Sequence, residues 1–247
     1  RWQGRQWFSG FTGSMGTLVV MQAQAAVFAD SRYWVQAEAE LQGTGVDLVK
    51  IPTGTATHHL NWMVEQVPRG GTVGVDAQVL GLAAAAQLRH ALEAAGIALR
   101  TDLDVLEAAW DDRPALPTAA VYAHEAPHAP LSRSDKLVQV RQAMARHGAS
   151  HHFVSTVDDI AWITNLRGAD VNYNPVFLAH LLVAPAGCTL FVGAGKVPAA
   201  LAERLAAEGF ALADYGQAPT ALARLSSSDV LLMDPRRVTL GLRQAVA

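Results

Sequence analysis

Apolar runs and helical patterns alternate along the N-terminal half of the chain. The pattern predicts strands at residues 17–21, 25–29, 46–51 and 72–75, and helices at residues 33–41, 58–67 and 76–95. The first two runs are separated by a short polar segment, which is typical of a β-hairpin. Gly96 follows the longest helical pattern and is placed to end it. This half is therefore predicted to be an α/β domain.

The C-terminal half carries a similar order of patterns. Strands are expected at residues 153–157, 177–184, 189–192, 210–213 and 230–233, and helices at residues 135–147, 160–163, 197–207 and 219–225. Ser134 is expected to cap the first of these helices. Thr156 and Asp159 have the spacing of a capping box for the second. Two runs around residues 185–187 predict a second hairpin.

A short motif occurs twice, which indicates that one fold is written twice in this chain. Residues 162–168 (Trp-Ile-Thr-Asn-Leu-Arg-Gly) repeat the pattern of residues 7–13 (Trp-Phe-Ser-Gly-Phe-Thr-Gly). The second motif follows a helix and a strand, whereas the first comes almost at the start, so the front of the first copy is expected to be missing. Prolines crowd residues 112–130, as in a connector. We expect one domain at residues 1–130, truncated at its N-terminus, and another at residues 131–247.

Composition narrows the classes of protein. The chain has 247 residues and 51% hydrophobic content, enough for two domains that each bury a core. Its 19 basic and 22 acidic residues nearly balance, which argues against nucleic acid or an anionic membrane as a partner. Residues 8–29 carry no charge, but their glycines and glutamines make a poor membrane span. The single cysteine, Cys188, lies in an apolar run and is expected to be buried, which fits a reducing cytoplasm.

Most sequence features that suggest chemistry have a structural explanation. The glycines of residues 10–16 lack the spacing of a nucleotide-binding loop, and we expect them to turn the chain at positive φ. Adjacent histidine side chains diverge, so His58-His59 and His151-His152 are not expected to share a metal ion. His124, Glu125 and His128 lie in the proline-rich connector, without a rigid frame. Asp158 and Asp159 are explained by helix capping.

Two further considerations concern catalytic chemistry. The sequence contains no serine in a nucleophile elbow, and its one cysteine lies in a predicted strand. No catalytic residue and no metal ligand is therefore assigned. Arg32 is the charged residue hardest to dismiss, since it lies where a strand ends and a helix begins and could clamp a carboxylate through two N–H groups. From the local sequence alone, a surface ion pair is the simpler interpretation.

Several segments together resemble the N-terminal, non-catalytic part of aminopeptidase P, the Xaa-Pro aminopeptidase group of the creatinase and prolidase superfamily. The segments are residues 7–17, 30–37, 74–76, 110–114, 158–170 and 174–177. Their order and spacing cover nearly the whole chain. The resemblance implies two related α/β domains of the creatinase/prolidase N-terminal type, each a mixed sheet flanked by helices. In three-domain members, a C-terminal pita-bread domain follows, and it is expected to be absent here.

The resemblance also implies a function. The family's third domain holds two divalent metal ions, expected to be manganese, and removes the residue that precedes proline at the N-terminus of a peptide. The present chain would then bind no metal, position substrate, contribute to a homodimer in the cytoplasm and be inactive alone. One alternative is a non-catalytic module that binds protein partners such as histones, as in relatives that have lost catalysis. Another is a fragment of a creatinase-like amidinohydrolase.

One substrate-binding residue carries over by resemblance. Arg32 corresponds to the arginine of the family's Asp-Gly-Arg-Tyr motif, which contacts substrate from the N-terminal domain. Here Ser31 stands in place of the usual glycine, which changes the local backbone but keeps the guanidinium. With the resemblance included, substrate binding becomes the favoured role of Arg32.

Overall fold

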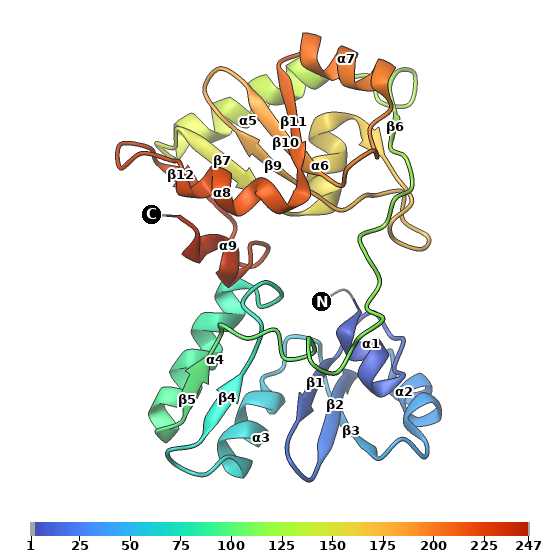
Figure 1. Ribbon diagram of the computed structural model, residues 1–247, viewed down its shortest axis with the longest axis vertical. Helices are drawn as coiled ribbons and strands as arrows, with labels where there is room; N and C mark the ends of the chain where they lie inside the picture. The colour runs from blue at the N-terminus through green and yellow to red at the C-terminus, as the bar shows by residue number, and fades with distance from the viewer. Residues whose placement is uncertain (1–2, 247) are drawn as a thin grey trace. The chain divides into compact units, whose positions relative to one another are not determined.

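The computed structural model describes residues 3–246, and these form two compact units. The first unit comprises Arg1–Ala77 and Ala84–Pro114, and the second comprises Gln78–Ala83 and Ala115–Ala247. Each unit contains its own strands and helices (Figure 1). The fold class predicted from the sequence, two α/β domains with mixed sheets, is confirmed.

The first unit is built on a three-stranded and a two-stranded sheet. Its elements are α1 (Gly4–Ser9), β1 (Thr17–Val20), β2 (Ala25–Asp30), α2 (Trp34–Leu41), β3 (Val46–Ile51), α3 (His58–Gln66), β4 (Thr72–Gly74), α4 (Leu82–Ala95) and β5 (Ala98–Arg100). Strand β2 lies in the centre of the larger sheet, antiparallel to β1 and parallel to β3. Strands β4 and β5 pair in parallel. The predicted hairpin is therefore confirmed.

Every residue of β2 is buried, because helices cover both faces of its sheet. Val27 and Ala29 pack with residues of α2 on one face. Phe28 packs with Ile51 and with Trp62 of α3 on the other face. Successive side chains of a strand point to opposite faces, so a continuous apolar run is what a strand covered on both sides requires.

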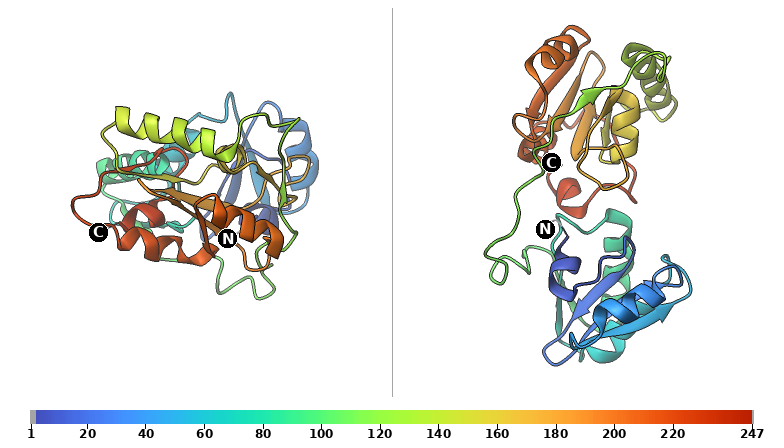
Figure 2. Two further views of the ribbon diagram at one scale, coloured as in Figure 1. Left: turned by 90° about the horizontal axis from the view of Figure 1, so that it is seen from above. Right: turned by 90° about the vertical axis from the view of Figure 1, so that its right-hand side faces the viewer.

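The second unit contains a five-stranded sheet in the order β11-β10-β9-β7-β12. Its elements are β6 (Tyr122–Ala123), α5 (Arg133–Arg146), β7 (His151–Val154), α6 (Val157–Thr164), β8 (Leu166–Arg167), β9 (Ala179–Val183), β10 (Cys188–Val192), α7 (Ala199–Ala207), β11 (Phe210–Asp214), the 3-10 turn η1 (Tyr215–Gln217), α8 (Ala218–Ala223), β12 (Leu231–Leu232) and α9 (Leu240–Gln244). Only β9 runs against its neighbours in this sheet. Helices α5 and α8 cover opposite faces (Figure 2).

The repeated sequence motif has the same local structure in both units. Ser9 donates its hydroxyl hydrogen bond to the carbonyl of Arg5, four residues earlier, and Thr164 does the same to Ile160. Both side chains are buried. The next residues, Gly10 and Asn165, end their helices in the left-handed region, at φ 76° and 49°. Glycine and asparagine are the residues that adopt this conformation most readily.

The division between the units differs from the boundary expected near residue 130. Val121 N–H donates to the carbonyl of Lys196 at 2.8 Å, and His124 N–H donates to that of Asn165 at 2.8 Å. Strand β6 pairs with β8. These backbone bonds attach the proline-rich segment to the second unit, so the division falls after Pro114. Sequence composition alone does not reveal such pairing.

The predicted helix over residues 76–95 begins six residues later, as α4. The segment Gln78–Ala83 joins the second unit instead, where Gly81 forms an antiparallel bridge with Thr239. Gly96 ends the helix at φ 70°, as predicted. Two predicted caps are wrong: Ser132 caps α5 through a capping box with Asp135, and Thr156 makes no side-chain cap. Strand β7 also begins and ends earlier than expected.

Candidate substrate-positioning site

Arg32 lies at the carboxyl end of β2, immediately before α2. The turn between these elements is tight, since Tyr33 N–H donates to the carbonyl of Asp30 at 2.9 Å. Trp34 Nε1 then donates to the carbonyl of Ala29 at 2.9 Å and fixes the start of the helix to the strand. A parallel pair, β2 and β3, ends at this edge of the sheet. Carboxyl ends of parallel strands are where α/β folds usually bind ligands.

Asp30 holds the Arg32 guanidinium through two hydrogen bonds. Arg32 Nε donates to Asp30 Oδ1 at 3.0 Å and Nη2 donates to Oδ2 at 2.7 Å. The Arg32 backbone N–H also donates to Oδ1, at 3.1 Å. The side chain of Asp30 is 4% exposed, whereas that of Arg32 is 63% exposed. The carboxylate is thus part of the protein interior, and the cation it orients faces solvent.

The ion pair affects the protonation of both groups. The hydrogen bond from Arg32 holds the pKa of the Asp30 carboxyl below its ordinary value. The same bond raises the pKa of Arg32 above that of a free guanidinium. The pair is therefore charged at every physiological pH, and the exposed N–H groups of Arg32 can donate to a carboxylate or carbonyl oxygen of a ligand.

Four neighbouring residues shape the surroundings of this pair. The Arg32 guanidinium carbon lies 5.3 Å from the centre of the Tyr33 ring, and Tyr33 Oη is hydrogen-bonded to Ser14 Oγ at 2.5 Å. A methyl group added at Gly54 would lie 2.8 Å from Met15 Cε and 3.1 Å from Asp30 Oδ2. Glycine at position 54 therefore lets the loop after β3 approach the carboxylate closely.

The glycine-rich segment before β1 is braced from α1. Arg5 Nη1 donates to the carbonyl of Gly16 at 2.7 Å, and Nη2 donates to that of Gly13. Of the glycines at positions 10, 13 and 16, only Gly10 has a positive φ. A side chain at Gly13 would collide with the Phe11 ring, at 2.3 Å from its Cζ. The expectation of positive φ is thus right for Gly10 and wrong for the other two, which are needed for close packing.

The histidines and acids considered as metal ligands do not converge. Within residues 3–246, no group of three or more His, Cys, Asp or Glu side chains is arranged to hold a metal ion. The rings of His124 and His128 stack at 5.7 Å, but the carboxylate of Glu125 pairs with Arg133 and Arg204. A metal pair of the kind the resemblance implies therefore does not fit these residues.

Cys188 is buried in β10, as predicted. Burial raises the pKa of its thiol to about 12, so it is not a thiolate nucleophile at neutral pH. Asp158 and Asp159 lie in the first turn of α6, where negative charge is favourable. Among the described residues, no helix is long and apolar enough to span a membrane.

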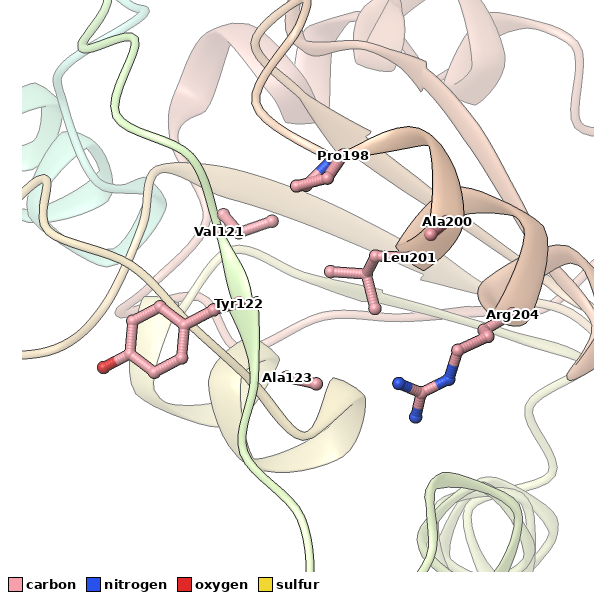
Figure 3. A pocket seen from close by; sticks show the side chains of 7 residues that line it. All are labelled: Val121, Tyr122, Ala123, Pro198, Ala200, Leu201 and Arg204. Atoms are coloured by element: carbon pink, nitrogen blue, oxygen red, sulfur yellow. The ribbon is translucent and has the colours of Figure 1, made fainter.

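A hollow of about 280 Å³ lies in the second unit, between β6 and α7 (Figure 3). It is lined by Val121, Tyr122, Ala123, Pro198, Ala200, Leu201 and Arg204. Its walls are apolar, and its one charged residue, Arg204, already pairs with Glu125. The hollow offers no group for acid–base or nucleophilic chemistry. We assign it no catalytic role.

Sequence reasoning missed two residues that matter for these units. The sequence assigns Asp30 no role, although a carboxylate two residues before an arginine at the end of a buried strand is a usable signal. Lys196 receives no role from the sequence either. Its amine lies 2.5 Å from Asp170 Oδ1, and the two side chains are 2% and 0% exposed. No local pattern predicts that pair, because its partners are far apart in the sequence.

Both halves of the chain match family models described as Creatinase/Prolidase N-terminal domain, over residues 3–104 and 112–247. The chain therefore belongs to the creatinase/prolidase N-terminal domain family. This confirms the resemblance inferred from the sequence.

Its curated relatives include aminopeptidases. The chain is 32% identical over 235 residues to Aminopeptidase P2 of Arabidopsis thaliana, covering 94% of this chain and 33% of that protein. It is 35% identical over 195 residues to a probable Xaa-Pro aminopeptidase P of Talaromyces marneffei, covering 78% and 30%. It is 30% identical over 246 residues to Xaa-Pro aminopeptidase 2 of Sus scrofa, covering 96% and 36%. The chain spans about a third of the length of these relatives.

The fold is that of a solved aminopeptidase structure. The X-prolyl aminopeptidase of Caenorhabditis elegans, described as a cytosolic enzyme with a di-nuclear active site, matches with a TM-score of 0.89. The match covers 98% of this chain and 40% of that chain at 22% identity. At this identity the likeness concerns the fold alone.

Proposed function

We propose that these residues form the N-terminal, non-catalytic part of an Xaa-Pro aminopeptidase, which removes the residue preceding proline from the N-terminus of a peptide. The observation that carries this proposal is that both halves belong to one N-terminal domain family and match proteins named aminopeptidase P or Xaa-Pro aminopeptidase. Two divalent ions, manganese in our proposal, are held elsewhere in the longer protein. The chain by itself is inactive.

The N-terminal part acts in the reaction through Arg32, which binds substrate. Its guanidinium is exposed, fixed in direction by Asp30, and keeps N–H groups that Asp30 does not use. A planar fork of this kind binds a carboxylate through two parallel bonds, and it can also donate to a peptide carbonyl. When one end of the peptide is already fixed, the peptide loses less translational and rotational entropy on reaching the reactive geometry. Arg32 thus positions substrate and takes no part in breaking the bond.

We also propose a cellular compartment and an oligomeric state for the enzyme. We place it in the cytoplasm, which agrees with the cytosolic description of the nematode relative. We also propose a homodimer to which these domains contribute contacts. Light scattering tests the second point on the 247-residue chain, and a monomer at all accessible concentrations contradicts it.

Activity assays on two proteins test the main proposal. The 247-residue chain with Mn²⁺ and an Xaa-Pro peptide is expected to show no turnover, and chelator-sensitive turnover would overturn the assignment. A chimera, in which the chain replaces the matching third of Arabidopsis Aminopeptidase P2, is expected to hydrolyse the same peptide. A folded chimera with no activity contradicts the proposal, and the unmodified Arabidopsis protein is the control.

A further inference from the structure

The second unit has a crevice at the carboxyl ends of two parallel strands. Strands β10 and β11 run in parallel, and Val192 pairs with Asp214 where both strands end. The loops that follow these two residues line a crevice of about 330 Å³, the β10–β11 crevice. Carboxyl ends of strands are where α/β sheets usually bind ligands, and this volume is large enough for a small molecule.

The crevice differs in charge from the corresponding place in the first unit. Each unit has an antiparallel hairpin followed by a strand parallel to the second hairpin strand. In the first unit, the exposed guanidinium of Arg32 lies at the carboxyl end of that parallel pair. In the second, Asp214 is the one charged residue that lines the crevice. Lys196 lies in the same loop, but it is 2% exposed and its amine is bound to Asp170. The crevice therefore suits a ligand that donates hydrogen bonds.

Asp214 and Gln217 are held together at the crevice. Asp214 N–H donates to Gln217 Oε1 at 3.2 Å, and Gly216 N–H donates to Asp214 Oδ1 at 3.0 Å. A carboxylate has about four acceptor sites, so Asp214 keeps sites for a ligand. Gln217 is bound through its amide oxygen, and its two N–H donors have no acceptor within residues 3–246. An acceptor beside a donor matches two neighbouring hydroxyl groups, each of which both donates and accepts.

The loop after β10 adds further donors. Lys196 N–H donates to the carbonyl of Gly193 at 3.3 Å and closes a turn in which Gly195 has φ 75°. In the part of the chain that the structure describes, the N–H groups of Ala194 and Gly195 make no backbone hydrogen bond. Leu212, which is 38% exposed, supplies an apolar wall on the β11 side. The crevice thus combines polar groups for hydroxyls with an apolar surface for a ring.

The order of elements around the crevice is that of a nucleoside-binding unit. Helix α7 joins β10 to β11 (Figure 1), and Asp214 follows Gly193 by about 20 residues. In dinucleotide-binding folds, a glycine-containing loop follows the first strand, and an acidic residue at this spacing binds the ribose hydroxyls. Gly193 and Gly195 match the first two glycines of that fingerprint, whereas Pro198 stands at the third. The match therefore concerns the ribose and does not extend to a pyrophosphate.

We propose that the β10–β11 crevice binds a ribonucleoside. The neighbouring 2′ and 3′ hydroxyl groups of the ribose donate to Asp214 and accept from Gln217, and the base lies against Leu212. The inference is independent of the peptidase proposal, because it uses no residue of the substrate-positioning site around Arg32.

Isothermal titration calorimetry of the 247-residue chain with adenosine tests the site. Adenosine is expected to bind with a Kd below about 1 mM. The nucleoside 2′-deoxyadenosine lacks one of the two hydroxyl groups and is expected to bind about tenfold more weakly, as for the loss of a hydrogen bond to a charged group. Failure of adenosine to bind at millimolar concentration would overturn the proposal. Equal affinity for the two nucleosides would overturn it as well, and that comparison needs no variant.

A variant pair assigns the binding to this crevice. Asp214→Asn should weaken adenosine binding by about tenfold, while the turn persists because asparagine caps as well as aspartate does. Asp229→Asn is the matched control, since Asp229 also accepts a backbone hydrogen bond, from Ser226 N–H at 2.8 Å, in a loop outside the crevice. It should bind adenosine as the wild type does. Unchanged binding by Asp214→Asn contradicts the proposal.

A simple sugar separates a nucleoside site from a general sugar site. Methyl β-D-glucoside carries neighbouring hydroxyl groups but no base, and it is expected to bind at least about tenfold more weakly than adenosine, because it makes no contact with the apolar wall. Equal affinity for the two ligands would overturn the assignment to a nucleoside.

Discussion

Arg32 and Gly195 lie at the same distance along the chain from the start of the second hairpin strand of their unit. Ala25 and Cys188 begin the second strands of the equivalent hairpins, and each of the two residues lies seven positions further on. The first copy presents an exposed cation at this junction, 63% exposed as a side chain. In the second copy the basic residue is the next one, Lys196, and it is buried against Asp170. Only the first copy can offer a cation to a ligand there.

Replacing Arg32 should weaken substrate binding without unfolding the protein. In the chimera with the Arabidopsis enzyme, Arg32→Ala is expected to lower kcat/KM for an Xaa-Pro peptide by about 10- to 100-fold, the loss typical of a hydrogen bond to a charged group. Arg32→Lys should recover only part of it, because an ammonium cannot form the planar fork.

Arg100→Ala is the control for this series. Arg100 forms the same two-bond pair with Asp102, at 3.1 and 2.7 Å, two residues away, but at the surface at the end of β5. Its removal should leave kcat/KM unchanged. Equal losses in the two variants would show that Arg32 acts only through general charge.

Asp30→Asn should lower the thermal unfolding midpoint, Tm, at neutral pH, because it weakens the bonds to Arg32. The folded pKa of Asp30 is lower than the unfolded value of about 3.9, so its stabilisation is present above that value and is lost as pH falls through the folded pKa. The difference in Tm between wild type and variant should therefore shrink below about pH 4. Asp102→Asn, at an exposed pair, should have little effect. A difference that is constant with pH would show that Asp30 does not act through its charge.

Lys196 and Asp170 should be strongly coupled. Lys196→Met leaves a buried carboxylate without its cation and is expected to cost about 3–5 kcal/mol of unfolding free energy. The double variant with Asp170→Leu should lose less, since no buried charge remains, although Leu178 N–H loses its acceptor at 2.7 Å. Urea denaturation measures both. The exposed pair of Lys50 and Glu38 is the control, where Lys50→Met should change stability by less than about 1 kcal/mol.

His180 should make the second unit sensitive to acid. Its ring lies between Phe153 and Tyr215, with centroids at 5.3 and 4.6 Å, and its Nδ1 is hydrogen-bonded to Ser155 Oγ at 2.9 Å. Burial lowers the pKa of His180 to about 4. The unfolded chain takes up this proton near pH 6.5 and the folded chain does not, so stability should fall between about pH 6.5 and 4, by at most about 3 kcal/mol.

His180→Gln cannot titrate and should lack this loss, measured as unfolding free energy against pH. His90→Gln, at an exposed position of α4, should keep the wild-type profile. A profile for His180→Gln that matches wild type would locate the acid sensitivity elsewhere.

The sequence determined the features that depend on neighbouring residues. The hairpin of β1 and β2, the strand β3 and the end of α4 at Gly96 all follow from periodicity and from glycine placement. The repeated motif predicted two copies of one fold, and the equivalent bonds of Ser9 and Thr164 show that the copies share local structure. Arg32 was selected by its place at a strand end together with family resemblance.

Only the tertiary structure decided what depends on residues far apart in the chain. It attached Gln78–Ala83 and the proline-rich segment to the second unit, although their composition is that of a helix start and a connector. It paired Lys196 with Asp170, and it showed that Asp30 is buried while the arginine it holds is not. The physical reason is that burial and long-range hydrogen bonds arise when chain segments meet, and the local pattern of a segment does not record which other segment it will meet.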